Sequence, residues 1–324
     1  MLTIAVIEGG YSSEKVISLK SAKTVQEHLD NSKYRTIRVR IDEEGWFAYT
    51  NSGKMGAVDK NDFSTVLNGE KINFDYAFIV IHGTPGEDGK LQAYFDMLNI
   101  PYNTCNQLLT NLTFNKYYCN RVLENLGIPV AKAVAVNSNE SFDSEAIIKH
   151  VGLPCFVKPA DGGSSFGVSK VKSEEELADA ISLACEHGTQ ALIESLLVGR
   201  EVTNGVYLGK EGIKVLPITE IVTDQEFFDY EAKYEGLSRE ITPAELDDAM
   251  TQKVKSRTKE VFQALKMTGL ARIDYIIMND EPYLIEINTV PGQSAQSIVP
   301  QMAAADGISL GQIFDEIIEL SIKK

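Results

Sequence analysis

Residues 272–288 place two carboxylates, an amide and a guanidinium at the spacing of one strand face. The segment alternates as two strands, and turn-forming residues separate these strands near position 280. A hairpin centred there puts Asp274 opposite Glu286 and Arg272 opposite Asn288, and the period of two puts all four on the same face. The opposite face then takes the apolar residues Ile273, Tyr275, Ile277, Ile285 and Ile287.

This polar face has the chemistry of a metal site. Two carboxylates held side by side repel each other unless a cation lies between them. Three oxygen donors without His or Cys suit Mg²⁺, which keeps water ligands and completes its shell with substrate phosphates. Arg272 beside them suits a developing anion or a transferring phosphoryl group. The alternative, a solvated edge hairpin with mixed charges, stays open from these residues alone.

A glycine-rich loop within residues 157–171 indicates phosphate binding. Two short strands flank a loop with three glycines and two serines, whose backbone N–H groups can cradle phosphates. Lys158, at the end of the first strand, is placed to reach the same phosphates. The pattern GxxxxGK[ST] is absent and no helix follows at once, so a P-loop is excluded. A plain flexible hairpin is the alternative.

Two loops near the N-terminus follow predicted strands, where open α/β sheets bind ligands. A glycine turn over 8–13 leads into a helix at Glu14, a carboxylate that either holds a ligand amine or favours the helix dipole. The loop from His82 to Gly89 follows the buried strand 76–81, a usual place for function. His82 is a candidate site residue there, and a satisfied structural histidine fits the pattern equally well.

Composition limits the class of protein. A chain of 324 residues can form two or three domains, and 44% hydrophobic with 24% charged residues is typical of a soluble globular protein. The net charge of −15 argues against nucleic acid or an anionic membrane as a partner. The four cysteines have no metal-binding spacing and are expected to be reduced thiols in a cytosolic protein. The N-terminus is typical of a first strand rather than a signal peptide, and no apolar run approaches the ~18 residues of a membrane helix.

The remaining pattern predicts the elements that position these segments. A strand is expected over 34–41, a hairpin and helix over 42–71, and one helix over 108–126 with Lys116 near its middle. The polar stretch 224–241 is long for a loop and is typical of a lid. Further helices are expected over 91–98, 142–150, 174–185, 243–267 and 310–320, and further strands over 2–7, 132–136, 191–197 and 199–207.

Five motifs together resemble the D-alanine–D-alanine ligase family of the ATP-grasp superfamily. They are GGYSSEKVISL at 9–19, HGTPGEDGKLQ at 82–92, VKPADGGSSFGVSKV at 157–171, EAKY at 231–234 and GLARID...YLIEINTVPG at 269–292. The resemblance covers essentially the whole chain, in the order and spacing of the family. Single motifs occur in other ATP-grasp enzymes, whereas the first two together are far more specific.

The resemblance implies an α/β protein with a three-domain ATP-grasp fold. An N-terminal open parallel-sheet domain would span 1–104, a central domain with the glycine-rich loop 105–194, and a C-terminal domain with the metal site and lid 195–324. The implied function is ATP-dependent ligation of two D-alanines through an acyl phosphate, for peptidoglycan precursor synthesis. ATP would be co-substrate and two Mg²⁺ ions, or Mn²⁺, the cofactor. The implied protein is a cytoplasmic homodimer that binds neither nucleic acid nor membrane.

The resemblance also assigns roles by position. Glu14 would hold the ammonium of the first D-alanine, Ser297 and Ile298 the carboxylate of the second, and His82 would belong to the substrate site. Arg272 and the Gly292 N–H would stabilise the tetrahedral oxyanion. Glu14, Ser164 and Tyr234 would form a triad that closes the lid. The implied ATP-binding residues are Lys116, Lys158, Gly163, Ser165, Glu194, Leu197, Glu201 and Lys233, and the implied metal ligands are Asp274, Glu286 and Asn288.

Some positions depart from the family pattern. Asn115 and Asn120 stand where Asp and Lys are common beside Lys116, and Leu196 where an aromatic residue is common. Asn103-Thr104-Cys105 replaces Thr-Gly-Ser, and Gln293 replaces Met or Phe close to the acceptor site, where it could alter acceptor preference.

The retained EAKY motif favours an amine acceptor, hence a dipeptide product. Two rival functions remain from the sequence. One rival is another carboxylate–amine ligase of this superfamily that takes D-serine, D-lactate or another amino acid. The other rival is an ATP-binding module without turnover.

Overall fold

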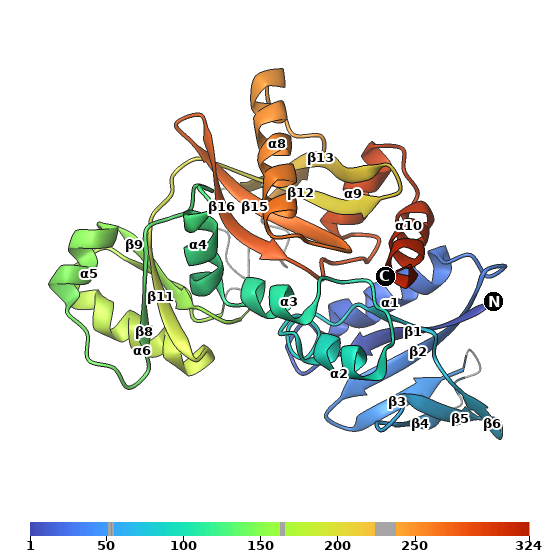
Figure 1. Ribbon diagram of the computed structural model, residues 1–324. Helices are drawn as coiled ribbons and strands as arrows, with labels where there is room; N and C mark the ends of the chain where they lie inside the picture. The colour runs from blue at the N-terminus through green and yellow to red at the C-terminus, as the bar shows by residue number, and fades with distance from the viewer. Residues whose placement is uncertain (51–52, 54, 163–165, 224–237, 324) are drawn as a thin grey trace.

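The computed structural model describes residues 1–50, 53, 55–162, 166–223 and 238–323. Its strands form three sheets with helices packed on their faces, at the lower right, left and top of Figure 1. Within the described ranges, no helix combines the length and apolar character needed to cross a membrane.

The first sheet has a parallel centre and carries both N-terminal loops. Its strand order is β6-β5-β4-β3-β2-β1-β7, and β1 (Leu2–Gly9) pairs in parallel with β2 (Tyr34–Asp42) and β7 (Tyr76–Ile79). Because parallel neighbours end at the same edge, the loops that follow β1 and β7 lie side by side. The first loop leads into α1 (Lys15–His28) and the second into α2 (Lys90–Leu98).

Within 42–71 the predicted hairpin is confirmed, but the predicted helix was wrong, because the described part of this segment forms antiparallel strands and no helix. Each strand has only three to five residues, too few to distinguish strand from helix periodicity. Phe63 is fully buried with Phe74, Phe95 and Tyr94 around its ring, so aromatic burial holds this part together. The strands, which extend the sheet in antiparallel fashion, are β3 (Gly45–Tyr49), β4 (Met55–Asp59), β5 (Ser64–Leu67) and β6 (Glu70–Ile72).

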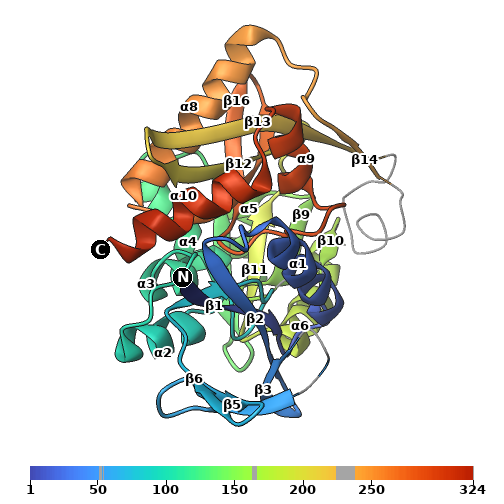
Figure 2. The same cartoon turned by 90° about the vertical axis from the view of Figure 1, so that its right-hand side faces the viewer.

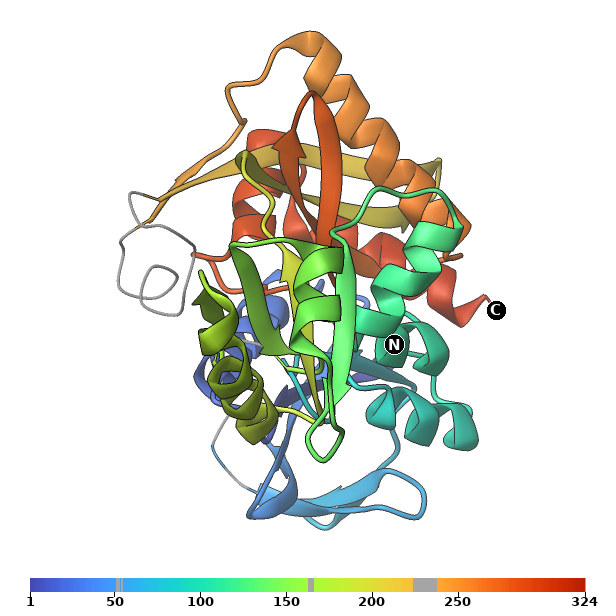
Figure 3. The same cartoon turned by 90° about the vertical axis from the view of Figure 1, so that its left-hand side faces the viewer.

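The second sheet carries the glycine-rich loop between β9 and β10. Figure 3 shows α5 (Ser144–Val151) and α6 (Leu177–His187) on its outer face, and the short 3₁₀ helix η1 (Glu174–Glu176) precedes α6. The strand order β10-β9-β11-β8 sets β9 between β10 and β11. The strands are β8 (Ala133–Asn137), β9 (Cys155–Pro159), β10 (Ser169–Val171) and β11 (Gln190–Ser195).

The single helix predicted over 108–126 is two helices, α3 (Gln107–Phe114) and α4 (Lys116–Asn125). Asn115 between them is extended, with φ −91° and ψ 102°. Its side chain caps α4 by accepting a hydrogen bond, at 3.1 Å, from a backbone N–H in the first turn. Lys116 therefore begins a helix instead of standing in the middle of one.

The third sheet is antiparallel, in the order β14-β13-β12-β15-β16. No strand was predicted where β13 lies, and Pro217 within it explains the weak pattern, since proline is tolerated only at edges and bulges. The register of β13 against β12 shifts beside Pro217. α8 (Asp248–Ala264) begins five residues after its predicted start at Pro243. Asp247 caps this helix by accepting a hydrogen bond from the Met250 N–H at 2.7 Å. The strands are β12 (Arg200–Gly209), β13 (Gly212–Thr223), β14 (Ser238–Ile241), β15 (Leu270–Met278) and β16 (Glu281–Asn288).

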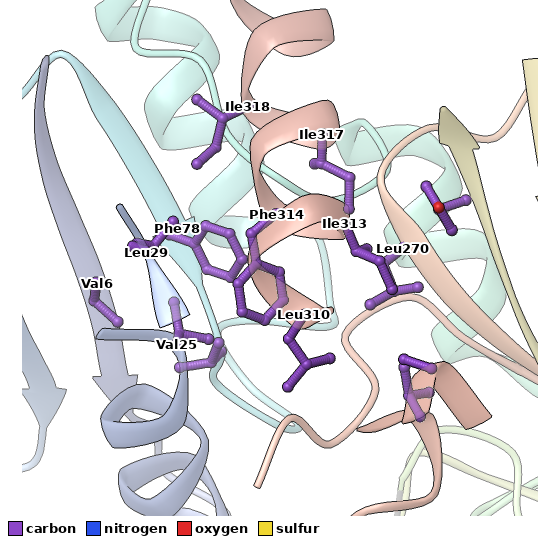
Figure 4. Close-up of a cluster of buried hydrophobic side chains, with 14 of the residues drawn as sticks. Val6, Val25, Leu29, Phe78, Leu270, Leu310, Ile313, Phe314, Ile317 and Ile318 are labelled. Carbon is purple, nitrogen blue, oxygen red and sulfur yellow. The ribbon is translucent and has the colours of Figure 1, made fainter. Parts of the chain in front are cut away.

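The C-terminal helix α10 (Leu310–Ile322) joins the first sheet to the third and follows α9 (Ile298–Ala305). Figure 2 shows α10 running between the two sheets, and Figure 4 shows the buried cluster that it forms with them. Phe314 of α10 meets Phe78 of β7 edge to face, with ring centroids 5.1 Å apart. Leu270 of β15 lies in the same cluster, so one core spans both sheets.

Candidate active site

A cleft of about 1000 Å³ lies between the three sheets and is lined from all of them. Glu14 reaches it from the loop after β1, Lys158 from β9, and Glu286 from β16. The loops and the hairpin that the sequence singled out separately therefore share one space. Of the predicted site residues, the lining contains Glu14, His82, Lys116, Lys158, Glu194, Leu197, Glu201, Arg272, Asp274, Glu286, Asn288, Gly292, Ser297 and Ile298.

The β15–β16 hairpin has the predicted register. Asp274 pairs with Glu286 and Arg272 with Asn288 across the strands. A register shift directly after Asp274 changes the alternation beyond it. The prediction that Ile285 lies on the apolar face was therefore wrong.

The bulge exchanges two neighbouring residues of β16. Leu284 is 1% exposed and joins the core, whereas Ile285 is only half-buried and lies outside that core cluster, although both touch the cleft. The other four predicted members of the apolar face, Ile273, Tyr275, Ile277 and Ile287, are buried.

Asp274 accepts hydrogen bonds at both carboxylate oxygens. Arg272 Nε donates to Oδ1 at 2.8 Å and Nη2 to Oδ2 at 2.7 Å. Asn288 Nδ2 donates to Oδ2 at 3.2 Å, and Thr203 Oγ1 donates to Oδ1 at 2.5 Å. Burial is the largest single influence and lowers the pKa of the Arg272 guanidinium, but the charge and hydrogen bonds of Asp274, together with the charges of Glu286 and Glu87, raise the net pKa. Arg272 is therefore a fixed positive charge at the floor of the cleft.

Lys116 forms an ion pair with Glu286, with 3.0 Å between Nζ and Oε1. Its Nζ also donates to the Gly162 carbonyl at 2.7 Å, and its backbone N–H donates to the Ala160 carbonyl at 2.8 Å. Burial is the largest single influence and lowers the pKa of this ammonium, but the Glu286 carboxylate, together with the charges of Glu194 and Glu87, raises the net pKa. Lys116 thus connects the start of the glycine-rich loop with the hairpin as a permanent cation.

Lys158 and Asn120 hold the Glu194 carboxylate from two sides. Lys158 Nζ lies 2.5 Å from Glu194 Oε2, and Asn120 Nδ2 donates to Oε1 at 2.9 Å. Asn120 is one of the departures from the family pattern, and the structure gives it a definite partner. Leu196 and Leu197 line the cleft beside this cluster.

The two N-terminal loops meet at the same end of the cleft. The Tyr11 N–H donates to the Thr84 carbonyl at 3.0 Å, and Ser12 Oγ donates to the His82 carbonyl at 2.9 Å. His82 is 6% exposed and lines the cleft. Glu14 is the N-cap residue of α1, and its side chain makes no capping hydrogen bond. The carboxylate of Glu14 is therefore positioned at the cleft and does not close the helix end.

Glu87 lines the cleft and was not predicted as a site residue. Its Oε2 accepts from the Gly83 N–H at 2.7 Å. Burial, followed by the negative charge of Glu14, raises the pKa of the Glu87 carboxyl to about 8. The available sequence signal was a carboxylate inside a glycine-rich loop at the end of a buried strand. Such a shifted group in a cleft is typical of functional sites.

α9 begins at one end of the cleft, and the segment before it contacts α1. Ser297 is its N-cap residue, and Ser297 Oγ lies 2.8 Å from Ser294 Oγ. A Cβ on Gly292 would come within 2.7 Å of Ser297 Oγ, which explains a residue without a side chain there. A helix N-terminus favours negative charge, so this end suits a carboxylate, as predicted for Ser297 and Ile298. Ser294 is a further lining residue that the sequence did not indicate.

Gln293 lies behind this end of the cleft. It is 4% exposed, and its backbone N–H donates to Ser21 Oγ of α1 at 3.1 Å. Within the described lining of the cleft, Gly292 and Ser294 are present and Gln293 is absent. An influence of Gln293 on the acceptor would therefore act through its neighbours.

Asn103-Thr104-Cys105 connects the first sheet to the strand β15. Asn103 Oδ1 accepts from the Ile79 N–H at 2.6 Å and Nδ2 donates to the Ile79 carbonyl at 3.1 Å, as a paired strand would. Thr104 Oγ1 accepts from Gln92 at 3.0 Å, and Cys105 Sγ lies 3.2 Å from the Thr268 carbonyl. This departure from the family pattern thus has a structural role.

The donor set of the hairpin fits Mg²⁺. Asp274, Glu286 and Asn288 offer carboxylate and amide oxygens on the cleft side, without nitrogen or sulfur ligands. Among the described residues, no group of three or more His, Cys, Asp and Glu side chains has a metal-binding arrangement. The predicted residues Gly163, Ser164, Ser165, Lys233 and Tyr234 lie outside the described residues.

Comparison with known proteins identifies the family. The family profile described as D-ala D-ala ligase N-terminus matches residues 3–105, and the one described as D-ala D-ala ligase C-terminus matches residues 122–319. A D-alanine–D-alanine ligase of Flavobacterium johnsoniae is 50% identical over 322 residues, covering 99% of this chain and 100% of that protein.

Two solved structures show the same architecture. The VanG D-Ala:D-Ser ligase from Enterococcus faecalis superposes with a TM-score of 0.86 at 32% identity, covering 99% of both chains. The D-alanine–D-alanine ligase from Bacillus anthracis complexed with ATP superposes with a TM-score of 0.80 at 29% identity, covering 100% of this chain and 98% of that one. The resemblance carried by the sequence motifs is confirmed. The chain belongs to the D-alanine–D-alanine ligase family and has the ATP-grasp fold of that family.

Proposed function

We propose that the protein joins two D-alanines into D-alanyl-D-alanine at the expense of ATP, as a step in peptidoglycan precursor synthesis. One observation carries the proposal: the paired carboxylates of the hairpin, the cations Lys116 and Lys158, and the carboxylate Glu14 all line the same cleft. Phosphates, a metal ion and an amino group each find complementary charge there. The relative from Flavobacterium johnsoniae, a D-alanine–D-alanine ligase, supports the same activity.

The reaction begins with activation of the first D-alanine. Its carboxylate oxygen attacks the γ-phosphorus of ATP in line, the bond to the β–γ bridging oxygen breaks, and ADP leaves with an acyl phosphate formed. Lys116 and Lys158 offset charge on the phosphates, and Glu14 holds the substrate ammonium. Mg²⁺, when bound by Asp274, Glu286 and Asn288, supplies further neutralisation of the transferring group.

The second half-reaction is acyl transfer. The amine of the second D-alanine, as free base, attacks the acyl carbon to give a tetrahedral oxyanion. The attacking nitrogen then loses one proton and the C–O bond to phosphate breaks, so that phosphate leaves and the peptide bond is formed. Arg272 and the Gly292 N–H stabilise the oxyanion. The N-terminus of α9, with Ser297 and Ile298, holds the carboxylate of the acceptor.

Several finer points belong to the same proposal. Glu194, Leu197 and Glu201 form the nucleoside end of the cleft. The glycine-rich loop and the lid, with Gly163, Ser164, Ser165, Lys233 and Tyr234, cover the phosphates and exclude water. Two Mg²⁺ ions are bound, with Mn²⁺ able to replace them. The protein works as a cytoplasmic homodimer with domains over 1–104, 105–194 and 195–324.

D-serine is the most important alternative acceptor to compare with D-alanine in an activity assay. The structurally similar VanG protein is a D-Ala:D-Ser ligase, so one fold accommodates both acceptors. Phosphate release from ATP should be measured with purified protein and Mg²⁺, with D-alanine, L-alanine, D-serine or D-lactate added separately. We expect release to depend on D-alanine and to yield the dipeptide, and we expect Glu286→Gln to lose this activity.

The result also separates the rivals. Faster turnover with D-serine or D-lactate in the presence of D-alanine would assign the other acceptor. Phosphate release stimulated only by an unrelated amino acid would leave the fold and change the substrate. ATP binding without turnover under all conditions would leave only a nucleotide-binding module.

A further inference from the structure

Thr203 is a buried threonine whose hydroxyl lies against a predicted metal ligand. It is 3% exposed, and its Oγ1 donates to Asp274 Oδ1 at 2.5 Å. The Ile273 carbonyl is a second, longer acceptor at 3.2 Å. A hydroxyl has one proton, and a bond to a carboxylate is the stronger of the two choices. The Thr203 proton is therefore directed mainly at Asp274.

The sheet fixes this contact. β12 and β15 are antiparallel neighbours, and Thr203 stands directly opposite Asp274 in their register. Directly opposed residues project on the same face of a sheet, where their side chains meet. Moving Thr203 away from Asp274 would require a change in strand pairing.

The other donors to Asp274 differ from Thr203 in what else they do. Arg272 carries a positive charge, which offsets the negative charge through which Asp274 attracts a metal cation. Its proposed role is to stabilise the tetrahedral oxyanion. Asn288 is itself an assigned metal ligand. Thr203 is neutral, so it orients the carboxylate without cancelling its charge. The Thr203 contact is thus compatible with every stage of the reaction.

We propose that Thr203 is a positioning residue for the metal site, whose hydroxyl fixes the orientation of the Asp274 carboxylate at the cleft. This inference rests on the proposed function, in which Asp274 binds Mg²⁺. Hydrogen bonds from outside the ligand set orient metal ligands in this way, and losing one typically costs about 10–100-fold in metal affinity.

A purely structural explanation competes with this one. A buried threonine needs a hydrogen-bond acceptor wherever it lies, and Asp274 could simply satisfy it. Thr219 provides the matched control, since it stands opposite Thr203 on β13 and is fully buried. The hydroxyl of Thr219 lies 2.6 Å from Thr242 Oγ1 instead of a metal ligand. Both threonines lose one buried hydroxyl when changed to valine, and only one of them touches Asp274.

The test measures metal binding without turnover. The dissociation constant of Mn²⁺ is determined by electron paramagnetic resonance on the full-length protein saturated with a non-hydrolysable ATP analogue. We expect Thr203→Val to weaken Mn²⁺ binding by about 10–100-fold. Thr203→Ser, which keeps the hydroxyl, should bind close to the wild-type value, and so should Thr219→Val. Thermal unfolding of the metal-free proteins checks that each variant is folded. If a valine variant does not fold, Thr203→Ala and Thr219→Ala are compared instead.

Each outcome separates the inference from the proposed function. Wild-type affinity in Thr203→Val, or equal weakening in Thr219→Val, overturns the role of Thr203 and leaves the ligase proposal intact. Failure of the wild-type protein to bind Mn²⁺ with the nucleotide analogue overturns both. Weak binding in Thr203→Val with rescue in Thr203→Ser supports the inference.

Discussion

Glu87 carries a carboxyl group whose charged form the folded protein disfavours. Its pKa is raised to about 8, because the group is buried and faces the negative charge of Glu14. Glu286 also raises this pKa, whereas the Gly83 N–H and Lys116 lower it. An unfolded chain would lose the same proton near the ordinary value of 4.5. Between these two values the folded protein binds one proton more than the unfolded chain, so its free energy of unfolding falls as the pH rises.

Glu87→Gln should therefore change stability in a pH-dependent way. Glutamine cannot ionise, and its amide oxygen can still accept the Gly83 N–H. We expect the free energy of unfolding of the variant, relative to that of wild type, to be larger at about pH 9 than at about pH 5. Urea unfolding of both proteins at both pH values measures this difference. Glu27→Gln on α1, whose side chain is 58% exposed, is the control. An unchanged difference between Glu87→Gln and wild type at the two pH values would contradict the shifted pKa.

Single residues show where sequence reasoning about the site succeeded. Asp274 and Glu286 were placed opposite each other correctly, because alternation and a short turn together determine the register of a hairpin. Ile285 was assigned to the wrong face, because the extra residue of a bulge leaves no mark in an alternating pattern. Glu87 was missed, because its shifted pKa depends first on burial and then on the charge of Glu14, and only the fold brings both about. Roles assigned to residues outside the described ranges remain predictions.

The break between α3 and α4 places Lys116 at the start of a helix, and Asn115 causes this break. The Asn115 side chain caps α4, and its backbone bridges to Asp161 beside the glycine-rich loop. Asn115→Ala removes the cap and favours one continuous helix, which would rotate Lys116 away from Glu286. We expect a loss of about 1 kcal/mol in stability from the cap, together with a raised KM for ATP. Urea unfolding and steady-state kinetics measure the two effects.

Asn106 offers a control of the same kind. It caps α3 by accepting from the Leu109 N–H at 3.0 Å and does not begin the helix of Lys116. Asn106→Ala should lose a similar amount of stability and keep the KM for ATP. Asn115→Asp, which preserves a capping oxygen, should restore both properties. If Asn106→Ala raised the KM for ATP as much as Asn115→Ala, the break would have no special role.

The elements that sequence reasoning missed share a physical cause. β3 to β6 are too short for periodicity, and they are held by ring packing around Phe63 that only the fold brings together. The pattern of β13 is interrupted by Pro217 at a bulge. The break at Asn115 did have a signal, since asparagine is among the best N-cap residues, but an apolar helical pattern runs through it on both sides. Longer elements such as β1, β2 and α10 were predicted close to their observed bounds.

The molecule as a whole divides its predicted binding residues between parts that α10 connects. Glu14 and His82 belong to loops of the first sheet, whereas Lys116, Lys158 and the hairpin belong to the other two. α10 packs on the first and third sheets through one buried cluster (Figure 4). Ser321 of α10 also accepts from the Tyr76 hydroxyl at 3.2 Å. The relative position of amino acid and nucleotide therefore depends on this helix.

Phe314→Leu should loosen this connection without unfolding the protein. Phe314 is fully buried against Phe78, and the smaller side chain should cost about 1–2 kcal/mol, less than the ~3–5 kcal/mol of truncation to alanine. We expect the KM for D-alanine to rise more than the KM for ATP, because Glu14 and His82 would shift relative to the hairpin. Phe262→Leu is the control. Phe262 of α8 is 2% exposed, and the described members of its cluster lie on α3, α4, α8, the third sheet and the loops beside them, without α10 or the first sheet. A parallel rise of both KM values in Phe314→Leu, or the same split in Phe262→Leu, would show that α10 does not set the distance between the two substrates.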